Sequence, residues 1–206
     1  MNGYKKSPFN RRYIVIAAII VGSILLGFAV DLVWGIFEKK NTPQRYSDYV
    51  RQYAYEYNVP ESLIYAVIKV ESNFDANAYS SAGAMGLMQM MPSTFKEMTS
   101  DKYLGENLDV DELFDPEVSI RYGTYYLKYL HEWFDGNWDN AIAAYNGGMG
   151  NVKEWLSSSE YSDGEGNLTY IPFKETRNYV EKVKKARKTY QELYYKDGKE
   201  VNIYEQ

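Results

Sequence analysis

The sequence lacks cysteine and has little histidine. Its 206 residues contain no cysteine and one histidine, His131. Disulfides, thiol nucleophiles and cysteine-ligated metals are therefore excluded. A single histidine also disfavours a histidine-rich metal site and a Ser-His-Asp triad. Nothing else in the sequence marks His131 as a base, so we interpret it as structural or exposed, and we expect neither a metal nor another cofactor.

Acidic residues outnumber basic ones. The formal net charge is -5 at pH 7, and no basic stripe dominates any predicted face. We therefore expect no nucleic-acid partner. Aromatic residues are plentiful by contrast, with 22 tyrosines and four tryptophans. They suit a carbohydrate or another flat polar ligand, although core packing and amphipathic surfaces account for most of them.

The long apolar run near the N-terminus predicts a membrane anchor. Residues 1–12 carry Lys5, Lys6, Arg11 and Arg12 without any acid, and residues 13–37 are mostly apolar, with Asp31 as their one charged residue. Eleven strongly apolar side chains in this run favour insertion by roughly 3 to 7 kcal/mol. Asp31 would cost about 3 kcal/mol at the bilayer centre and much less near an interface. Insertion is therefore favoured.

We predict that residues 13–37 form an uncleaved, single-pass anchor in the cell membrane. The positive-inside rule places the basic segment, residues 1–12, in the cytoplasm and the remainder of the chain outside. A cleaved signal peptide is the alternative, but the apolar run is long and no A-x-A site follows it. The missing cysteine excludes a lipoprotein. Residues 38–45, which include Pro43, are the expected linker.

The remainder of the chain predicts one mainly α domain, residues 46–195, followed by a polar tail, residues 196–206. Apolar spacing, capping residues and prolines indicate the helix boundaries, and no segment forms long alternating strands. The segment 101–113 is acidic and is expected to be an irregular loop. The expected helices cover residues 47–57, 60–71, 92–98, 116–134, 138–148, 149–156 and 173–195.

Glu71 ends one of these helices on its apolar face. Ile64, Val67 and Ile68 lie seven, four and three residues before it, so all four share one side of a 3.6-residue helix. Burial and the negative end of the helix dipole both disfavour the charged carboxylate. A carboxyl that stays protonated near neutral pH can act as a general acid. A surface glutamate at a frayed helix end is the alternative.

An uncharged, methionine-rich run follows Glu71. It comprises residues 87–91, after the Gly83-Ala84-Met85-Gly86 segment and before Pro92. The run is too short to span a membrane and does not alternate as a half-buried strand does. We expect it to form the wall of a cleft, approached closely by backbone and lined with apolar side chains.

Four segments, in this order, resemble a known family. They are ESNF at 71–74, GAMGLMQMMP at 83–92, AAYNGG at 143–148 and IPFKETRNYV at 171–180. Together they resemble the soluble lytic transglycosylase (SLT) domain of the goose-lysozyme-like superfamily. The segment SIRYGTYYL at 119–127 is similar to the central helix of that family. The resemblance covers roughly residues 46–194 and implies a lysozyme-like, all-helical domain behind the anchor.

The resemblance also implies roles for individual residues. Glu71 matches the family's sole catalytic acid/base, and Ser80 matches a serine near the N-acetylmuramic acid of the substrate. The sequence departs from many members at two positions beside the site, with Gly147 in place of alanine and Met149 in place of proline. The positions expected to bind substrate are Ser80, Gln89, Met91, Tyr145, Asn146, Glu175 and Tyr179.

The implied activity is cleavage of the MurNAc-GlcNAc β-1,4 bond in peptidoglycan glycan strands, leaving a 1,6-anhydromuramyl end. Ordinary glycosidases use two carboxylates, whereas a lytic transglycosylase can work with one. A hydrolytic muramidase of goose-lysozyme type, with Asp75 positioning water, is one alternative. A non-catalytic glycan-binding or wall-assembly protein is the other. The sequence identifies no protein partner in a cell-wall or secretion complex.

Overall fold

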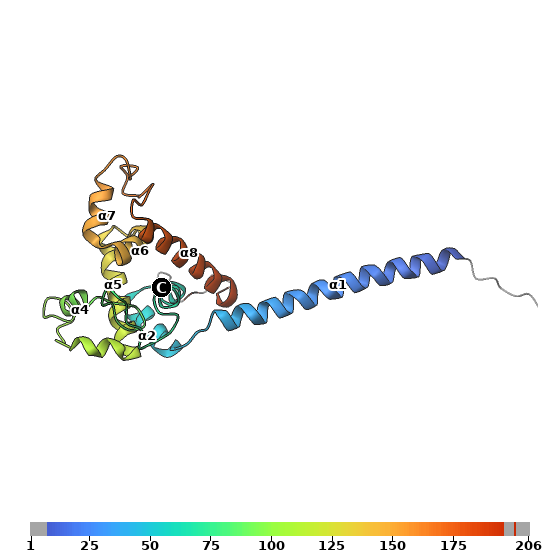
Figure 1. Cartoon of the computed structure of the whole chain (residues 1–206), viewed down its shortest axis with the longest axis horizontal. Helices are drawn as coiled ribbons and strands as arrows, with labels where there is room; N and C mark the ends of the chain where they lie inside the picture. The colour runs from blue at the N-terminus through green and yellow to red at the C-terminus, as the bar shows by residue number, and fades with distance from the viewer. Residues whose placement is uncertain (1–7, 196–199, 201–206) are drawn as a thin grey trace, which may run out of the picture. The chain divides into compact units, whose positions relative to one another are not determined.

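The computed structural model describes residues 8–195 and residue 200. The chain divides into two compact units, Met1–Pro43 and Gln44–Gln206, which are described separately below. Figure 1 shows their elements along the chain. The polar tail predicted at residues 196–206 lies outside the described residues, apart from Glu200.

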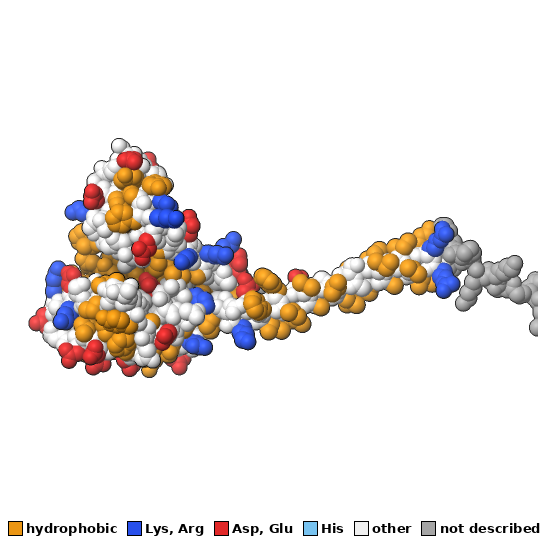
Figure 2. Space-filling view, viewed as in Figure 1, with side chains coloured by type: hydrophobic (Ala, Val, Ile, Leu, Met, Phe, Trp, Pro, Cys, Tyr) orange, Lys and Arg blue, Asp and Glu red, His pale blue; other side chains and the backbone are white. Residues whose placement is uncertain are grey.

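The first unit contains one long helix, α1 (Pro8–Asn41). Its segment Arg11–Asn41 is long and apolar enough to cross a membrane. Apolar side chains cover the visible face of α1, with basic side chains at its N-terminal end (Figure 2). The helix continues beyond Phe37 into the predicted linker, where Lys39 and Lys40 occupy its last turn. Basic side chains there interact favourably with the helix dipole.

The second unit is helical throughout most of its length. The described residues contain no β-strand, only the isolated bridges Tyr79–Met85, Met85–Met90 and Ser162–Leu168. The predicted mainly α fold class is therefore confirmed. The helices are α2 (Ser47–Tyr57), α3 (Glu61–Glu71), α4 (Pro92–Met98), the short 3₁₀ helix η1 (Val110–Phe114), α5 (Pro116–Trp133), α6 (Trp138–Gly147), α7 (Met149–Leu156) and α8 (Lys174–Tyr194).

Local capping explains where several helices begin. The Asp115 carboxylate accepts hydrogen bonds from the backbone nitrogens of Glu117 and Val118, at 2.8 and 3.2 Å, at the start of α5. The Asn137 side chain accepts one from the nitrogen of Asn140, at 3.0 Å, at the start of α6. Each cap satisfies amide groups that have no partner within the helix. The 3₁₀ helix η1 corrects part of the segment that we expected to be irregular.

Helix α3 lies at the centre of the main core. It packs against α8 and α2, while α5 packs against α2, α6 and η1. Residues 62–68 of α3 are all buried, so this helix has no solvated face over that length. A second, smaller core lies between α4, η1 and α5, and it is formed by Met85, Met90, Phe95, Met98, Leu113 and Tyr122.

The methionine-rich run belongs to these cores. Met85, Leu87, Met88 and Met90 are each at most 5% exposed, whereas Met91 is 41% exposed. The expectation that the run lines a cleft is therefore wrong for Leu87, Met88 and Met90, whereas Gln89 is half-buried and Met91 is exposed. The physical reason is a tight turn: the backbone groups of Met85 and Met90 exchange hydrogen bonds of 3.0 and 3.1 Å. This pairing folds the run back on itself and directs its side chains inward.

Two glycines provide the space for this turn. Gly86 has a φ of 76°, and a Cβ atom there would overlap the carbonyl oxygen of Leu113. Gly123 lies within α5, where a Cβ would come within 2.5 Å of the Met88 sulfur. The turn and α5 therefore approach each other at positions that carry no side chain.

Gly86→Ala tests this close approach. We expect a loss of more than about 2 kcal/mol in the free energy of unfolding, because overlap adds to the strain of a left-handed residue. Denaturant unfolding of the full chain in detergent measures it. Gly150→Ala is the matched control, since a Cβ there meets no atom within 4 Å. A loss at Gly86 no larger than that at Gly150 would contradict the interpretation.

Candidate active site

Glu71 is the last residue of α3, and it is largely buried while keeping part of its surface accessible. Burial raises the pKa of its carboxyl from 4.5 to about 7, and the nearby Tyr179 hydroxyl opposes this rise. Among the described residues, no charged side chain contributes to the shift in the pKa of Glu71. The protonated form of Glu71 therefore persists to near neutral pH, and in this form a carboxyl can donate a proton.

Two tyrosines surround the carboxyl. Burial, followed by the charge of Glu71, raises the pKa of both Tyr145 and Tyr179 well above the ordinary value. The Tyr145 hydroxyl donates a 2.8 Å hydrogen bond to the carbonyl oxygen of Met88. The Tyr179 hydroxyl is buried with no partner at hydrogen-bonding geometry, although it lies close enough to Glu71 to affect the carboxyl's pKa. It is therefore available to donate to the ionised carboxylate.

The chain turns sharply after Glu71. The Ser72 hydroxyl donates to the carbonyl oxygen of Leu87 at 2.8 Å, which ties the end of α3 to the methionine-rich run. Asn73 and Phe74 then both adopt left-handed conformations, with φ of 51° and 67°. Such conformations cost non-glycine residues of order 1 kcal/mol or more each. The burial of Phe74, which is 3% exposed, helps to maintain the turn.

Ser80 and Gln89 hold the segment between Ala78 and Met90 together. The Ser80 hydroxyl oxygen accepts a 2.9 Å hydrogen bond from the nitrogen of Ala84. The Gln89 amide nitrogen donates to the carbonyl oxygens of Ala78 and Gly86, at 3.0 and 2.9 Å. Each of these residues therefore has a structural role in this turn. Their contacts with substrate stay predictions.

Asn146 and Glu175 come together where α6 ends and α8 begins. Both are exposed, and they line one pocket of about 470 Å³ together with Gly147, Phe173, Lys174 and Thr176. Figure 2 shows the surface of the second unit hollowed between the part that carries α7 and the part that carries α4.

Asp75 does not act on Glu71 in this arrangement. It is exposed, and its side chain accepts a 2.9 Å hydrogen bond from the nitrogen of Asn77. It is absent from the groups that shift the pKa of Glu71. The described residues around Glu71 therefore provide one carboxyl rather than the coupled pair of an ordinary glycosidase.

Three residues that contact the site or its backbone were not predicted from the sequence to do so. Ser72 and Ser119 hold the backbone of the run, the latter by accepting a 3.2 Å hydrogen bond from the nitrogen of Met88. The Tyr126 ring lies 5.4 Å from that of Tyr145, centroid to centroid. Ser72 follows Glu71 directly, and Tyr126 lies near the apolar face of its helix, but neither signal indicates a particular partner.

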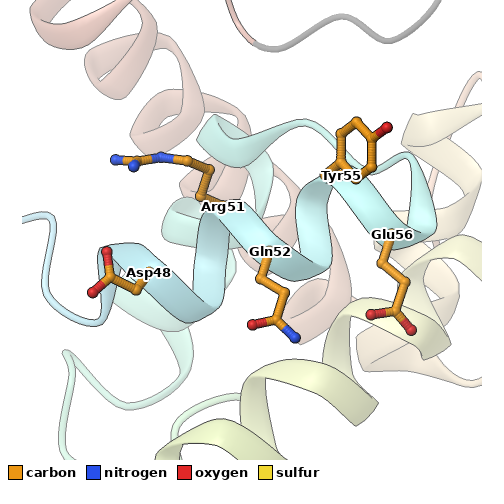
Figure 3. A pocket seen from close by; sticks show the side chains of 5 residues that line it. All are labelled: Asp48, Arg51, Gln52, Tyr55 and Glu56. Atoms are coloured by element: carbon orange, nitrogen blue, oxygen red, sulfur yellow. The ribbon is translucent and has the colours of Figure 1, made fainter.

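The concavity over α2 does not form an equivalent site. It is shallow and is lined by Asp48, Arg51, Gln52, Tyr55 and Glu56. Figure 3 shows that all five side chains come from this one helix and spread along it without converging. Among the described residues, no cluster of three or more histidine, aspartate or glutamate side chains could hold a metal ion.

Glu71→Gln tests the cost of burying this carboxyl. Between pH 4.5 and about 7, the folded state holds a proton that the unfolded state has released, so the free energy of unfolding falls as pH rises. We expect the variant, which cannot ionise, to be more stable than the parent by about 1 to 3 kcal/mol at pH 8. Below pH 4.5 this pH-dependent difference should vanish.

Denaturant unfolding across this pH range measures the effect in the full chain. Glu165→Gln, at an exposed loop glutamate, is the control, and its stability should follow that of the parent across the pH range. A Glu71→Gln variant whose stability follows that of the parent at every pH would contradict the raised pKa.

Comparisons with known proteins agree with this geometry. The profile of the Transglycosylase SLT domain family matches residues 48–167. The soluble lytic murein transglycosylase of Escherichia coli K12 is 35% identical over 152 residues, which cover 73% of this chain and 23% of the relative. The membrane-bound lytic murein transglycosylase C of Edwardsiella ictaluri is 33% identical over 190 residues, 82% of this chain and 52% of the relative.

Solved structures give the same assignment. The 70 kDa soluble lytic transglycosylase of E. coli superimposes with a TM-score of 0.70 at 32% identity, covering 81% of this chain and 26% of that one. An inactive mutant of lytic transglycosylase Slt from Pseudomonas aeruginosa gives 0.67 at 35% identity, covering 75% and 25%. The chain thus spans about a quarter to a half of these relatives' lengths. It belongs to the transglycosylase SLT domain family.

Proposed function

We propose that this protein is a membrane-anchored lytic transglycosylase of peptidoglycan. It would cleave the MurNAc-GlcNAc β-1,4 bond and leave a 1,6-anhydromuramyl end, with Glu71 as sole general acid/base. The observation that carries the proposal is the buried Glu71 carboxyl, whose pKa of about 7 is set by burial and one tyrosine hydroxyl. A binding module would gain little from such a group, because burial of a carboxyl is costly.

The proposed reaction uses Glu71 twice. Protonated Glu71 donates its proton to the glycosidic oxygen that leaves, and the N-acetyl group of the substrate supports the positive charge that develops at C1. The Glu71 carboxylate then takes the proton of the muramyl C6 hydroxyl while that oxygen bonds to C1. The carboxyl is thus restored without water. The buried Tyr179 hydroxyl, close to Glu71, would stabilise the carboxylate between the two steps.

The remaining site residues would bind the glycan around Glu71. Met91 and Asn146 are exposed, and the pocket shared by Asn146 and Glu175 offers room beside the site. We assign contacts with the glycan to the residues predicted from the sequence: Ser80, Gln89, Met91, Tyr145, Asn146, Glu175 and Tyr179.

The relatives support this assignment of substrate and reaction. Those from E. coli and E. ictaluri are named as lytic murein transglycosylases. The P. aeruginosa protein was crystallised as an inactive mutant in which glutamine replaces a glutamate, so a glutamate is required in that protein. These relatives are longer than this chain, so their activity need not belong to the part that this chain matches. Peptidoglycan is therefore proposed as the substrate of this chain.

The long apolar helix α1 supports a location at the cell membrane. We propose that residues 13–37 cross the cell membrane once, with residues 1–12 in the cytoplasm, residues 38–45 as the linker and residues 46–195 outside. Support comes from the length and apolar composition of α1 and from the basic residues that precede the apolar run. The E. ictaluri relative is named as membrane-bound. This location would keep the enzyme beside the cell wall.

The proposed chemistry can be tested by digesting purified peptidoglycan and weighing the products. We expect products one water lighter than hydrolysed ones, and a rate that falls as pH rises through about 7, where Glu71 ionises.

Glu71→Gln should lower the rate at least about a hundredfold, while Asp75→Asn should stay near the parent rate. Products with only reducing muramic ends would instead establish the muramidase. Equal lysis by Glu71→Gln would exclude the acid/base role.

The orientation can be tested with single cysteines, because the natural chain has none. Cysteine at exposed Ser159 should react with a membrane-impermeant maleimide in spheroplasts whose outer surface is accessible. Cysteine at Ser7 should react only after the membrane is permeabilised. The reverse pattern would invert the topology, and release of the Ser159→Cys protein from the membrane fraction would indicate cleavage of the N-terminal helix.

A further inference from the structure

A row of aromatic rings leads away from the candidate site along α5. Tyr126, Tyr129 and Trp133 lie three and four residues apart, which places them on one side of the helix. The row begins at Tyr145, whose ring centroid lies 5.4 Å from that of Tyr126. The next separations are 6.3 Å from Tyr126 to Tyr129 and 6.2 Å from Tyr129 to Trp133. We call Tyr145, Tyr126, Tyr129 and Trp133 the aromatic row.

Exposure increases at the far end of this row. The three tyrosines are half-buried, whereas Trp133 is 48% exposed. Among the described residues of the second unit, it is the only tryptophan on the surface, since Trp138 is half-buried and Trp155 is buried. Packing between neighbouring turns accounts for Tyr126 and Tyr129, but it does not require an exposed indole at the end of the helix.

The middle of the row is supported from a second segment. The Tyr103 ring meets that of Tyr129 edge-on, at 5.5 Å and 88°. The Tyr103 hydroxyl donates a 3.1 Å hydrogen bond to the Glu97 carboxylate, which fixes Tyr103 beside α4. Two segments outside α5 therefore pack against the row: Tyr145 of α6 contacts Tyr126, and Tyr103 contacts Tyr129.

The chemistry of the row suits sugar rings. A pyranose presents apolar C–H groups on its faces and hydroxyl groups around its edge, and aromatic side chains offer an apolar face to the former. The hydroxyls of Tyr126 and Tyr129 are neutral near neutral pH, with pKa values that burial raises to about 12, and they can hydrogen-bond sugar hydroxyls. The row itself carries no charge, which favours an uncharged polymer backbone over a charged peptide or a nucleic acid.

We propose that the aromatic row binds the same glycan strand beyond the bond cleaved at Glu71, with Trp133 stacking against a distant sugar ring. This inference rests on the proposed function, because it takes its occupant from the substrate of that site. The row is continuous with the candidate site: it starts at Tyr145, whose hydroxyl donates to the carbonyl oxygen of Met88. The neighbouring carbonyl, that of Leu87, accepts from Ser72, the residue after Glu71. A long strand that passes Glu71 and continues along α5 would meet both the carboxyl and the row. The enzyme would therefore prefer long strands to short ones.

The preference for length provides the test. The full chain in detergent is given uncrosslinked glycan strands, fractionated by length, and the ratio of kcat/KM on long strands to that on the shortest cleaved strands is measured. Trp133→Ala should lower this ratio roughly two- to tenfold, the range for losing one aromatic contact. Trp133→Phe, which keeps a ring, should retain most of it. Tyr55→Ala, which removes an exposed ring on α2 (Figure 3), should leave the ratio unchanged.

A binding measurement separates this inference from the proposed function. Fluorescently labelled long strands are titrated with Glu71→Gln protein, with and without Trp133→Gln, which removes the ring but stays polar and soluble. Weaker binding after loss of the ring supports the aromatic row even if peptidoglycan is not cleaved. Equal binding by both proteins overturns it, as would an equal loss of kcat/KM on short and long strands or a failure of Trp133→Phe to restore the ratio.

Discussion

Two hydrogen bonds to neighbouring backbone carbonyls hold the site together. The Ser72 hydroxyl donates to the oxygen of Leu87, and the Tyr145 hydroxyl donates to that of Met88. Because Leu87 and Met88 are fully buried, losing such a bond would leave a polar group without a partner, at a cost of about 1 to 3 kcal/mol. The end of α3, the methionine-rich run and α6 are thereby joined around Glu71. The bonds that complete the core also position the carboxyl.

The site around Glu71 contains polar groups but little charge. Tyr145 and Tyr179, which respond to the charge of Glu71, are neutral near neutral pH as tyrosines ordinarily are, and burial raises their pKa values further. A lysine or arginine in either place would favour the ionised carboxylate and lower its pKa. Neutral hydroxyls instead allow the carboxyl to gain and lose its proton near neutral pH. The folded state is destabilised where this carboxyl ionises, because burial disfavours its charged form.

Features that depend on local chemistry were predictable from the sequence. Asp115 and Asn137 cap the helices that follow them, and the apolar spacing before Glu71 indicated its burial. Features that depend on distant partners were not. Gln89 and Ser80 were assigned to substrate from the family resemblance, but hydrogen bonds to Ala78, Ala84 and Gly86 also occupy them. The methionine-rich run resembled a cleft wall because its turn, and the second core it fills, arise only when α4, η1 and α5 assemble.

Gly86 and Gly123 have a consequence for how such a protein can change over time. Enzymes often gain stability by mutations that reduce activity. Here the same absent side chains give the run its place in the core and, through Leu87 and Met88, hold the groups around Glu71. A larger residue at either glycine would displace the run and the carboxyl's supports together. Stability and the proposed activity are therefore constrained in the same direction at these positions, and selection on either one would preserve the other.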